Sequence, residues 1–332
     1  MHYDVILVGT SPIVLTKAFF EVALGKTVLI IENNKNYGGS WQSLGIENIG
    51  IVESGCHIMY RNLKMDNFFI NTIGIDFINL IPQPIIVKNE KIYNYRFTAF
   101  INHTELPLMK FLKGFPRYSF DILNCSKFKY PKGGSLEMVN KLILKLKENN
   151  VTFLKRKINS LRILENKVFI NDSNISANKI ILTPNLNIKN ILYDGGNYEF
   201  PKTEKRQVQN LYLKFNYFKK IISYVGIKNS FIFRISDMSY DYNDNFRLYC
   251  VQINKIYFEE NSNEQILNKV LEYLKNLNFL PKSHDIIDYK FHSFKYEHRM
   301  FDEIKFVEEK FNKNIEILYT HNFTHGIARI LC

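Results

Sequence analysis

The sequence predicts an α/β protein with two parts: a Rossmann-like domain of three layers, and a smaller inserted domain built on a mixed or antiparallel sheet. The first 31 residues read as a β-α-β unit, and residues 130–190 add a helix and several short apolar strands. In residues 205–257, apolar and polar residues alternate with many Tyr, Phe and Ile, as in antiparallel strands. The chain has 332 residues, of which 46% are hydrophobic, so it can bury a core in each part.

The β-α-β unit consists of a strand over Tyr3–Val8, a helix over Pro12–Leu24 and a strand over Thr27–Ile31. Both strands are continuous apolar runs, which is typical of a parallel sheet covered on both faces. Gly25 ends the helix, and about 30 residues is the length that such a unit needs.

Later segments predict the remaining elements and the division of the chain. They are a hairpin over 84–97 turning near Asn89 and Glu90, a helix over 135–148, a strand over 151–155, a strand pair near 160–170, a strand over 179–182, a helix over 265–277 and a strand over 315–319. We assign residues 1–75, 130–190 and 300–332 to the first, discontinuous domain. Residues 76–129 and 191–299 then form the second domain, where we expect the substrate to bind.

Charge and cysteine usage exclude several classes of function. The net charge is +12, but the lysines form no block and no basic-aromatic motif accompanies them. We therefore expect no nucleic-acid binding, whereas binding of an anionic small molecule is compatible with the positive charge. No run of about 20 apolar residues predicts a membrane span. The four cysteines form no C-x-x-C pair, so we predict no metal site and expect reduced thiols in a cytoplasmic protein.

The segment GTSPIV, residues 9–14, stands where a dinucleotide-binding protein carries G-x-G-x-x-G, and only its first glycine is present. Gly9 supplies the tight turn. Ser11 lies at the position of a helix N-cap, and Pro12 at the first helical position, where its missing N–H costs no hydrogen bond. The helix N-terminus that attracts a pyrophosphate is therefore preserved. Glu32 ends the second strand, where a carboxylate can accept hydrogen bonds from an adenosine ribose. The alternative is an ordinary strand-loop-helix that binds no ligand.

The sequence resembles a superfamily of FAD-binding flavoproteins in three blocks, which occur in the same order as in that superfamily. These blocks are residues 3–41, 130–158 and 180–184. The superfamily includes UDP-galactopyranose mutase, protoporphyrinogen oxidase, the amine oxidases and the Rab escort/GDP-dissociation-inhibitor proteins. The resemblance implies that the first domain binds FAD. It places cofactor contacts at Gly38, Gly39, Ser40 and Trp41 in the loop after Glu32, at Val151, at Thr183, and at Gly326 and Ile327 near the C-terminus.

Within this superfamily, the closest local similarity is to the UDP-galactopyranose mutases. The stretch ESGCHIMYRN resembles their G-x-H-I-x-x-x-N segment, and FIFRISDMSY resembles their Y-x-R-I segment. By that comparison, Gly55 belongs to the cofactor site, His57 lies near the flavin ring, and Arg234 contacts an anionic group of the substrate. The region between the predicted hairpin and residue 130 is shorter than the helical substrate domain of the mutases.

Three functions are compatible with these features. The first is an FAD-dependent oxidoreductase that acts through flavin N5 on a small substrate, either an anionic molecule or a nucleotide sugar. The second is a redox-neutral isomerase similar to the mutases. The third is a non-catalytic binding protein built on the same fold, because the incomplete glycine motif would suit weakened FAD binding. The first two require a small-molecule partner.

Overall fold

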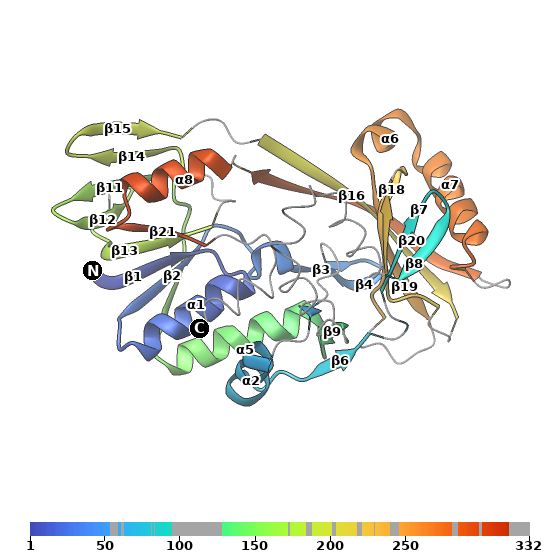
Figure 1. The fold of residues 1–332 in the computed structure, drawn as a ribbon, viewed down its shortest axis with the longest axis horizontal. Helices are drawn as coiled ribbons and strands as arrows, with labels where there is room; N and C mark the ends of the chain where they lie inside the picture. Colours follow the sequence, from blue (N-terminus) through green and yellow to red (C-terminus); the bar gives the residue numbers. More distant parts are fainter. Residues whose placement is uncertain are drawn as a thin grey trace, which may run out of the picture.

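The computed structural model describes residues 1–53, 59–60, 63–80, 82, 84–94, 128–171, 173–183, 188–200, 204–217, 221–228, 230–239, 246–280, 285–298 and 301–318. The strands in these residues form two large sheets at opposite ends of the molecule and two small sheets between them (Figure 1).

The first large sheet has the strand order β10-β2-β1-β13-β12-β11-β14-β15, and β21 also pairs with β13. The strands are β1 (His2–Val8), β2 (Val28–Glu32), β10 (Thr152–Lys155), β11 (Ser160–Leu164), β12 (Lys167–Ile170), β13 (Ser176–Leu182), β14 (Asn190–Tyr193), β15 (Gly196–Glu199) and β21 (Ile315–Ile317). The five strands β10, β2, β1, β13 and β21 run parallel. All of β2 and the second half of β1 are buried, which explains why they read as continuous apolar runs.

Helices and hairpins cover the two faces of this sheet. On one face, α1 (Pro12–Ala23) and α5 (Gly134–Glu148) lie side by side, and their apolar side chains share a core with β1 and β2 (Figure 1). On the other face, α8 (Phe301–Lys310) and the strands β11, β12 and β14 bury a second core. The predicted α/β class and the three-layer arrangement are therefore confirmed.

The second large sheet has the strand order β20-β16-β19-β18-β17-β7-β8. Its strands are β7 (Ile85–Lys88), β8 (Lys91–Asn94), β16 (Glu204–Asn216), β17 (Tyr224–Lys228), β18 (Ile232–Asp237), β19 (Arg247–Ile253) and β20 (Asp285–His298). All neighbouring strands are antiparallel except β17 and β7, so the sheet is mixed, as predicted. The predicted hairpin is β7–β8, and Asn89 and Glu90 turn it with positive φ.

The two faces of the second sheet have different neighbours. The helices α6 (Lys255–Glu260) and α7 (Asn263–Asn276) cover its outer face, where Ile266, Val270 and Leu274 of α7 join the core. Its opposite face, called the inner face below, packs on the hairpin of β3 (Ser43–Ile46) and β4 (Gly50–Glu53) that extends from the first part of the chain (Figure 1). The inner face is therefore turned toward the first sheet.

Short elements join these two parts. They are η1 (Gly39–Trp41), β5 (Met59–Tyr60), α2 (Leu63–Asn67), η2 (Phe68–Ile73), β6 (Phe77–Asn79) and β9 (Phe128–Pro131), and β9 pairs with both β5 and β6.

The elements that the sequence patterns do not predict include α8, β20, the hairpin β3–β4 and the hairpin β14–β15. The β14–β15 hairpin belongs to the first sheet, whereas the predicted division assigned residues from 191 onward to the second domain. Most of its side chains are exposed, so its strands lack the regular alternation of apolar and polar residues that would identify them.

A cluster of charged side chains fastens α1 to the sheet. Glu21 pairs with Lys17 (2.9 Å) and Lys26 (2.5 Å), and Lys17 also pairs with Glu316 of β21 (3.2 Å). Burial acts to raise the pKa of Glu21, but the two lysines outweigh it and hold that pKa below its usual value of 4.5. The ionised carboxylate therefore stabilises the folded chain.

Acid should weaken this cluster selectively. A carboxyl whose pKa is lower in the folded state stabilises the fold above its unfolded pKa, and the contribution is lost as the pH falls through the folded pKa. We therefore expect urea unfolding to show a stability advantage of the wild type over Glu21→Gln at about pH 7 that shrinks by about pH 3. An advantage that is the same at both pH values would show that Glu21 acts through packing rather than through charge.

Candidate nucleotide-binding site

The carboxyl ends of the parallel strands form one edge of the first sheet. β1 lies between β2 and β13, so the strand order reverses at β1. In open α/β sheets, ligands bind in the crevice outside the carboxyl ends of the strands at such a reversal. Gly9 follows β1, Glu32 ends β2 and Thr183 follows β13. The structure therefore brings these three predicted residues to the edge where a ligand is expected.

The turn from β1 into α1 has the backbone that the sequence predicts. Gly9 has a φ of +102°, a value that favours glycine, and Pro12 is the first residue of α1. Ser11 stands at the N-cap, but its hydroxyl makes no capping hydrogen bond. The first helical bond runs from the N–H of Leu15 to the carbonyl of Ser11 (3.0 Å), so the N–H groups of the preceding turn have no acceptor within the helix.

The loop of Gly38 and Gly39 packs against this helix end. Both glycines have positive φ, +109° and +58°. A Cβ on Gly39 would lie 3.3 Å from the Cβ of Ser11, and a Cβ on Gly38 would lie 3.0 Å from the backbone nitrogen of Gln42. Ser40 is exposed, whereas Trp41 is buried in the core that α5 shares. The paired glycines thus allow the loop to approach the N-terminus of α1 closely.

Thr10 connects the loop to the end of β2. It is fully buried, and its Oγ1 accepts a hydrogen bond from the N–H of Gly38 (2.9 Å) and donates one to Oε2 of Glu32. The other carboxylate oxygen, Oε1, accepts the N–H of Asn34 (2.8 Å). Glu32 is 2% exposed, so its carboxylate organises the loop from inside the protein. Sequence reasoning missed Thr10, because the position after Gly9 has no required residue type in the glycine motif.

Removing the Thr10 hydroxyl should destabilise the fold. Thr10→Val keeps the shape of the side chain but leaves the Glu32 carboxylate and the Gly38 N–H without this partner in a buried site. We expect a loss of about 2–3 kcal/mol in the free energy of unfolding, measured by urea denaturation.

Thr16→Val is the matched control, since Thr16 is also fully buried on α1. Its hydroxyl only donates to the carbonyl of Pro12, one turn back (2.8 Å). Such a bond adds little to helix stability, so we expect less than about 1 kcal/mol. Equal losses in the two variants would contradict a special role for Thr10.

The parallel strand at the edge of the sheet, β10, places Lys155 rather than the predicted Val151 beside the end of β2. Val151 precedes β10 and is buried in the core at the amino end of that strand, so it does not meet the other predicted residues. The opposite end carries Lys155, which pairs with Glu32 in the sheet register. The Nζ of Lys155 donates to the carbonyls of Asn34 (2.9 Å) and Lys35 (2.8 Å) and lies 3.6 Å from the centroid of the ring of Tyr37. Burial lowers the pKa of Lys155, against the opposing effect of Glu32.

Arg234 lies in the second sheet, on β18. It pairs with Gly226 of β17 and Gln252 of β19, and its Cζ is 5.8 Å from the ring centroid of Tyr224. The other predicted residues, Gly55, His57, Gly326 and Ile327, lie outside the described residues.

Glu53 links the first part of the chain to the second sheet. Its Oε1 accepts the N–H of Ser135 at the start of α5 (2.7 Å) and the hydroxyl of Tyr130. Its backbone carbonyl accepts the hydroxyl of Tyr212 on the inner face (2.7 Å). Burial raises the pKa of Tyr212, so this hydroxyl stays protonated and donates. Glu53 was not predicted as a site residue, although it is the first residue of the ESGCHIMYRN segment.

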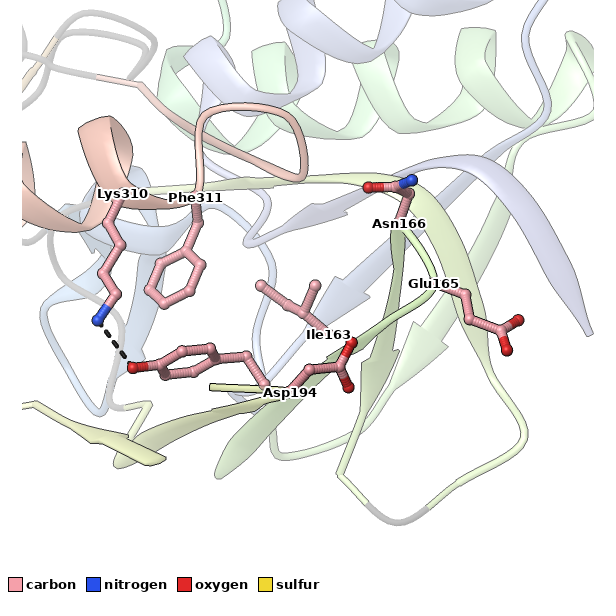
Figure 2. Close-up of a pocket in the computed structure, with 7 residues that line it drawn as sticks. Ile163, Glu165, Asn166, Asp194, Lys310 and Phe311 are labelled. Atoms are coloured by element: carbon pink, nitrogen blue, oxygen red, sulfur yellow. Dashed lines mark hydrogen bonds between the residues drawn. The ribbon is translucent and has the colours of Figure 1, made fainter. Parts of the chain in front are cut away.

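A separate pocket of about 430 Å³ lies between the β11–β12 turn, the end of β14 and the end of α8 (Figure 2). Ile163, Glu165, Asn166, Tyr193, Asp194, Lys310 and Phe311 line it, and the Nζ of Lys310 donates to the Tyr193 hydroxyl (2.9 Å). None of the predicted site residues is among them.

The described part of the chain holds no group of three or more His, Cys, Asp or Glu that could bind a metal. None of its helices is both long enough and apolar enough to cross a membrane.

No protein-family model and no curated protein sequence matches the chain. Solved structures do match it over its full length. Reduced UDP-galactopyranose mutase has a TM-score of 0.70 and 12% identity, with 100% of this chain and 93% of the mutase covered. Putrescine oxidase with putrescine bound has a TM-score of 0.67 and 13% identity, with 100% of this chain and 97% of the oxidase covered.

An oxidoreductase from Methanosarcina mazei has a TM-score of 0.58 and 11% identity, with 88% of each chain covered. The chain therefore has the fold of putrescine oxidase, of the mutase and of this oxidoreductase. The resemblance identified in the sequence is confirmed at the level of the fold.

Proposed function

We propose that the chain is an FAD-dependent oxidoreductase that holds the cofactor at the carboxyl edge of its first sheet. The N-terminus of α1 carries the proposal, because it presents N–H groups without helical acceptors beside a glycine loop, in a fold shared with an amine oxidase. FAD supplies the redox chemistry, since the flavin can accept a hydride from a substrate.

The residues at this edge fit a dinucleotide. The N-terminus of α1, following Gly9, Ser11 and Pro12, would hold the pyrophosphate through backbone N–H groups, and the loop over Gly38–Trp41 would lie against it. Each oxygen of the Glu32 carboxylate has a second lone pair, so Glu32 could still accept a ribose hydroxyl. We assign Thr183, Gly55, Gly326 and Ile327 to further cofactor contacts, as the resemblance implies.

On the substrate side we assign His57 and Arg234. The imidazole of His57 can take or give a proton near neutral pH. The guanidinium of Arg234 can clamp a carboxylate or phosphate of the substrate with two parallel hydrogen bonds.

A mutase-type isomerase that acts on a nucleotide sugar is the second candidate. The placement of Arg234 on the inner face, in a fold shared with UDP-galactopyranose mutase, favours it. It differs from the first candidate in needing a reduced flavin and no net electron transfer.

The visible spectrum of the purified chain, before and after FAD is added, tests the proposal. We expect oxidised-flavin bands that stay with the protein through gel filtration. Bleaching by a substrate without added reductant would support the oxidoreductase, whereas turnover only after prior reduction would support the isomerase. A colourless chain that leaves added FAD unbound would overturn both and favour a non-catalytic binding protein.

A further inference from the structure

The pocket between the β11–β12 turn, the end of β14 and the end of α8 carries opposite charges on its two sides. Figure 2 shows Lys310 on one side, and the carboxylates of Glu165 and Asp194 on the other. The apolar side chains of Ile163 and Phe311 lie between them. The volume of about 430 Å³ is within the range of small-molecule sites. The pocket therefore has room for a small ligand that meets both charges.

Aromatic side chains hold the ammonium group of Lys310 on its side of the pocket. Its Nζ donates to the hydroxyl of Tyr193 (2.9 Å). It also lies 4.6 Å from the centroid of the Tyr193 ring and 5.5 Å from that of Phe311, within the range of a cation–π attraction. An ammonium group has three N–H donors, and a hydroxyl that accepts one hydrogen bond can still donate another. This side of the pocket can therefore donate to an anionic group.

Gly195 leaves room for the Tyr193 ring. A Cβ at position 195 would lie 2.5 Å from Cε2 of Tyr193, which is closer than non-bonded carbon atoms approach. The ring also packs edge-to-face on Phe311, with the two centroids 5.4 Å apart. A side chain at position 195 would therefore displace the ring, together with the hydroxyl that meets Lys310.

The carboxylates on the other side come from two tight turns. Glu165 and Asn166 turn the β11–β12 hairpin with positive φ, +48° and +61°. The buried Asn314 fixes this turn, because its Nδ2 donates to the carbonyl of Asn166 (2.9 Å). Asp194 directly follows β14. Among the described residues, the carboxylates of Glu165 and Asp194 have no hydrogen-bond or ion-pair partner. Both can therefore accept hydrogen bonds from a cationic group.

We propose that this pocket binds a linear ω-amino acid, a small molecule with a carboxylate at one end and an ammonium group at the other. The carboxylate accepts hydrogen bonds from Lys310 and Tyr193, and the ammonium group donates to Asp194 and Glu165. The methylene chain between them covers the apolar side chains in the middle of the pocket. A simple anion would face the two carboxylates of the protein, and a simple cation would face Lys310, so neither is complementary to both sides. The proposal does not depend on the proposed flavin chemistry.

Calorimetric titration of the full chain with 6-aminohexanoate tests the proposal. We expect saturable binding. Hexanoate and hexylamine each carry only one of the two charged groups, so each should bind at least about tenfold more weakly. This comparison uses the wild-type chain throughout, and its outcome therefore does not depend on the folding of any variant.

Three variants locate the bound molecule. Lys310→Met keeps the apolar stem and removes the charge, and Asp194→Asn keeps the shape and removes the charge. Each should weaken binding of 6-aminohexanoate about tenfold or more. Gly195→Ala changes no charge but displaces the Tyr193 ring, and it should weaken binding at least about threefold.

Lys305→Met is the matched control, because Lys305 is exposed on the same helix, pairs with Glu309 (3.5 Å) and does not line the pocket. It should leave binding unchanged. The proposal is overturned if 6-aminohexanoate shows no saturable binding, or if hexanoate or hexylamine binds as tightly as it does. It is also overturned if Lys310→Met and Asp194→Asn bind 6-aminohexanoate as tightly as the wild type.

Discussion

Replacing Ser11 with aspartate is expected to weaken FAD binding by about 100-fold without destabilising the chain. Ser11 is the N-cap of α1, and aspartate is as good an N-cap as serine, with a charge that favours the positive end of the helix. The same charge would face the pyrophosphate. Two like charges about 4 Å apart near a protein surface repel by a few kcal/mol, and about 2.7 kcal/mol corresponds to a 100-fold loss.

Quenching of flavin fluorescence gives the dissociation constant, and thermal unfolding without FAD gives the stability. Ser11→Asn is the matched control, because asparagine has the size of aspartate and caps helices equally well but carries no charge. We expect the asparagine variant to bind FAD within about fivefold of the wild type. Equal affinity in the aspartate and asparagine variants would move the pyrophosphate away from α1 and refute the proposed cofactor position.

The sequence predicts this helix end well because its structure depends on local rules. Pro12 is favoured at the first position of a helix and disrupts a helix interior, and the short apolar runs before and after α1 are typical of buried parallel strands. The turn at Asn89 and Glu90 is equally local, since both residues must adopt positive φ. Such elements can be identified without knowing what they pack against.

The contacts that organise the site are less predictable, because they join residues far apart in the sequence. Thr10 matters through Glu32 and Gly38, and neither pairing follows from a motif. Val151 illustrates the converse. A strand that matches the family pattern was expected to contribute its first residue, yet in a parallel sheet the ligand edge is formed by the carboxyl ends, where Lys155 lies.

The neighbours of Arg234 across the second sheet are also invisible in the sequence, since they come from strands whose order in the sheet is β20-β16-β19-β18. Only Arg234 belongs to a recognisable segment. Its neighbours Gln252, Asn210 and His292 are defined by strand register alone, and register depends on the whole sheet.

Loss of the Glu53 carboxylate should be the most destabilising single change in the described part of the site. Glu53 is 7% exposed, and its carboxylate accepts the N–H of Ser135 at the N-terminus of α5 and the hydroxyl of Tyr130. A negative charge at a helix N-terminus is favourable, and hydrogen bonds to a charged acceptor contribute about 1.5–3 kcal/mol each. Glu53→Leu would bury two donors without acceptors, so we expect a loss of about 3–5 kcal/mol.

Urea unfolding with a comparison of midpoints and slopes measures this loss, and Glu53→Gln separates charge from shape. The glutamine keeps one carbonyl acceptor, so it should lose about 1–3 kcal/mol, less than leucine does. Glu137→Gln is the control, because Glu137 also carries a carboxylate in the first turn of α5 but is only half-buried there and forms an ion pair with Lys141 (2.7 Å). It should cost less than about 1 kcal/mol.

Glu53 also connects the two sheets. Its side chain holds α5, and its backbone carbonyl, which Glu53→Leu keeps, accepts the Tyr212 hydroxyl of the inner face. Release of α5 should therefore reach the second contact only through a displaced backbone. Tyr212→Phe removes the second contact, together with the hydrogen bond that the Tyr212 hydroxyl accepts from Asn210, and keeps the carboxylate on α5. Glu53→Leu is compared with Tyr212→Phe by the slope of the unfolding free energy against urea concentration and by the urea concentration at the midpoint of unfolding. If Glu53→Leu lowers the slope while Tyr212→Phe shifts only the midpoint, then the side chain of Glu53 maintains a single cooperative transition. Identical slopes in all variants would limit Glu53 to the local capping of α5.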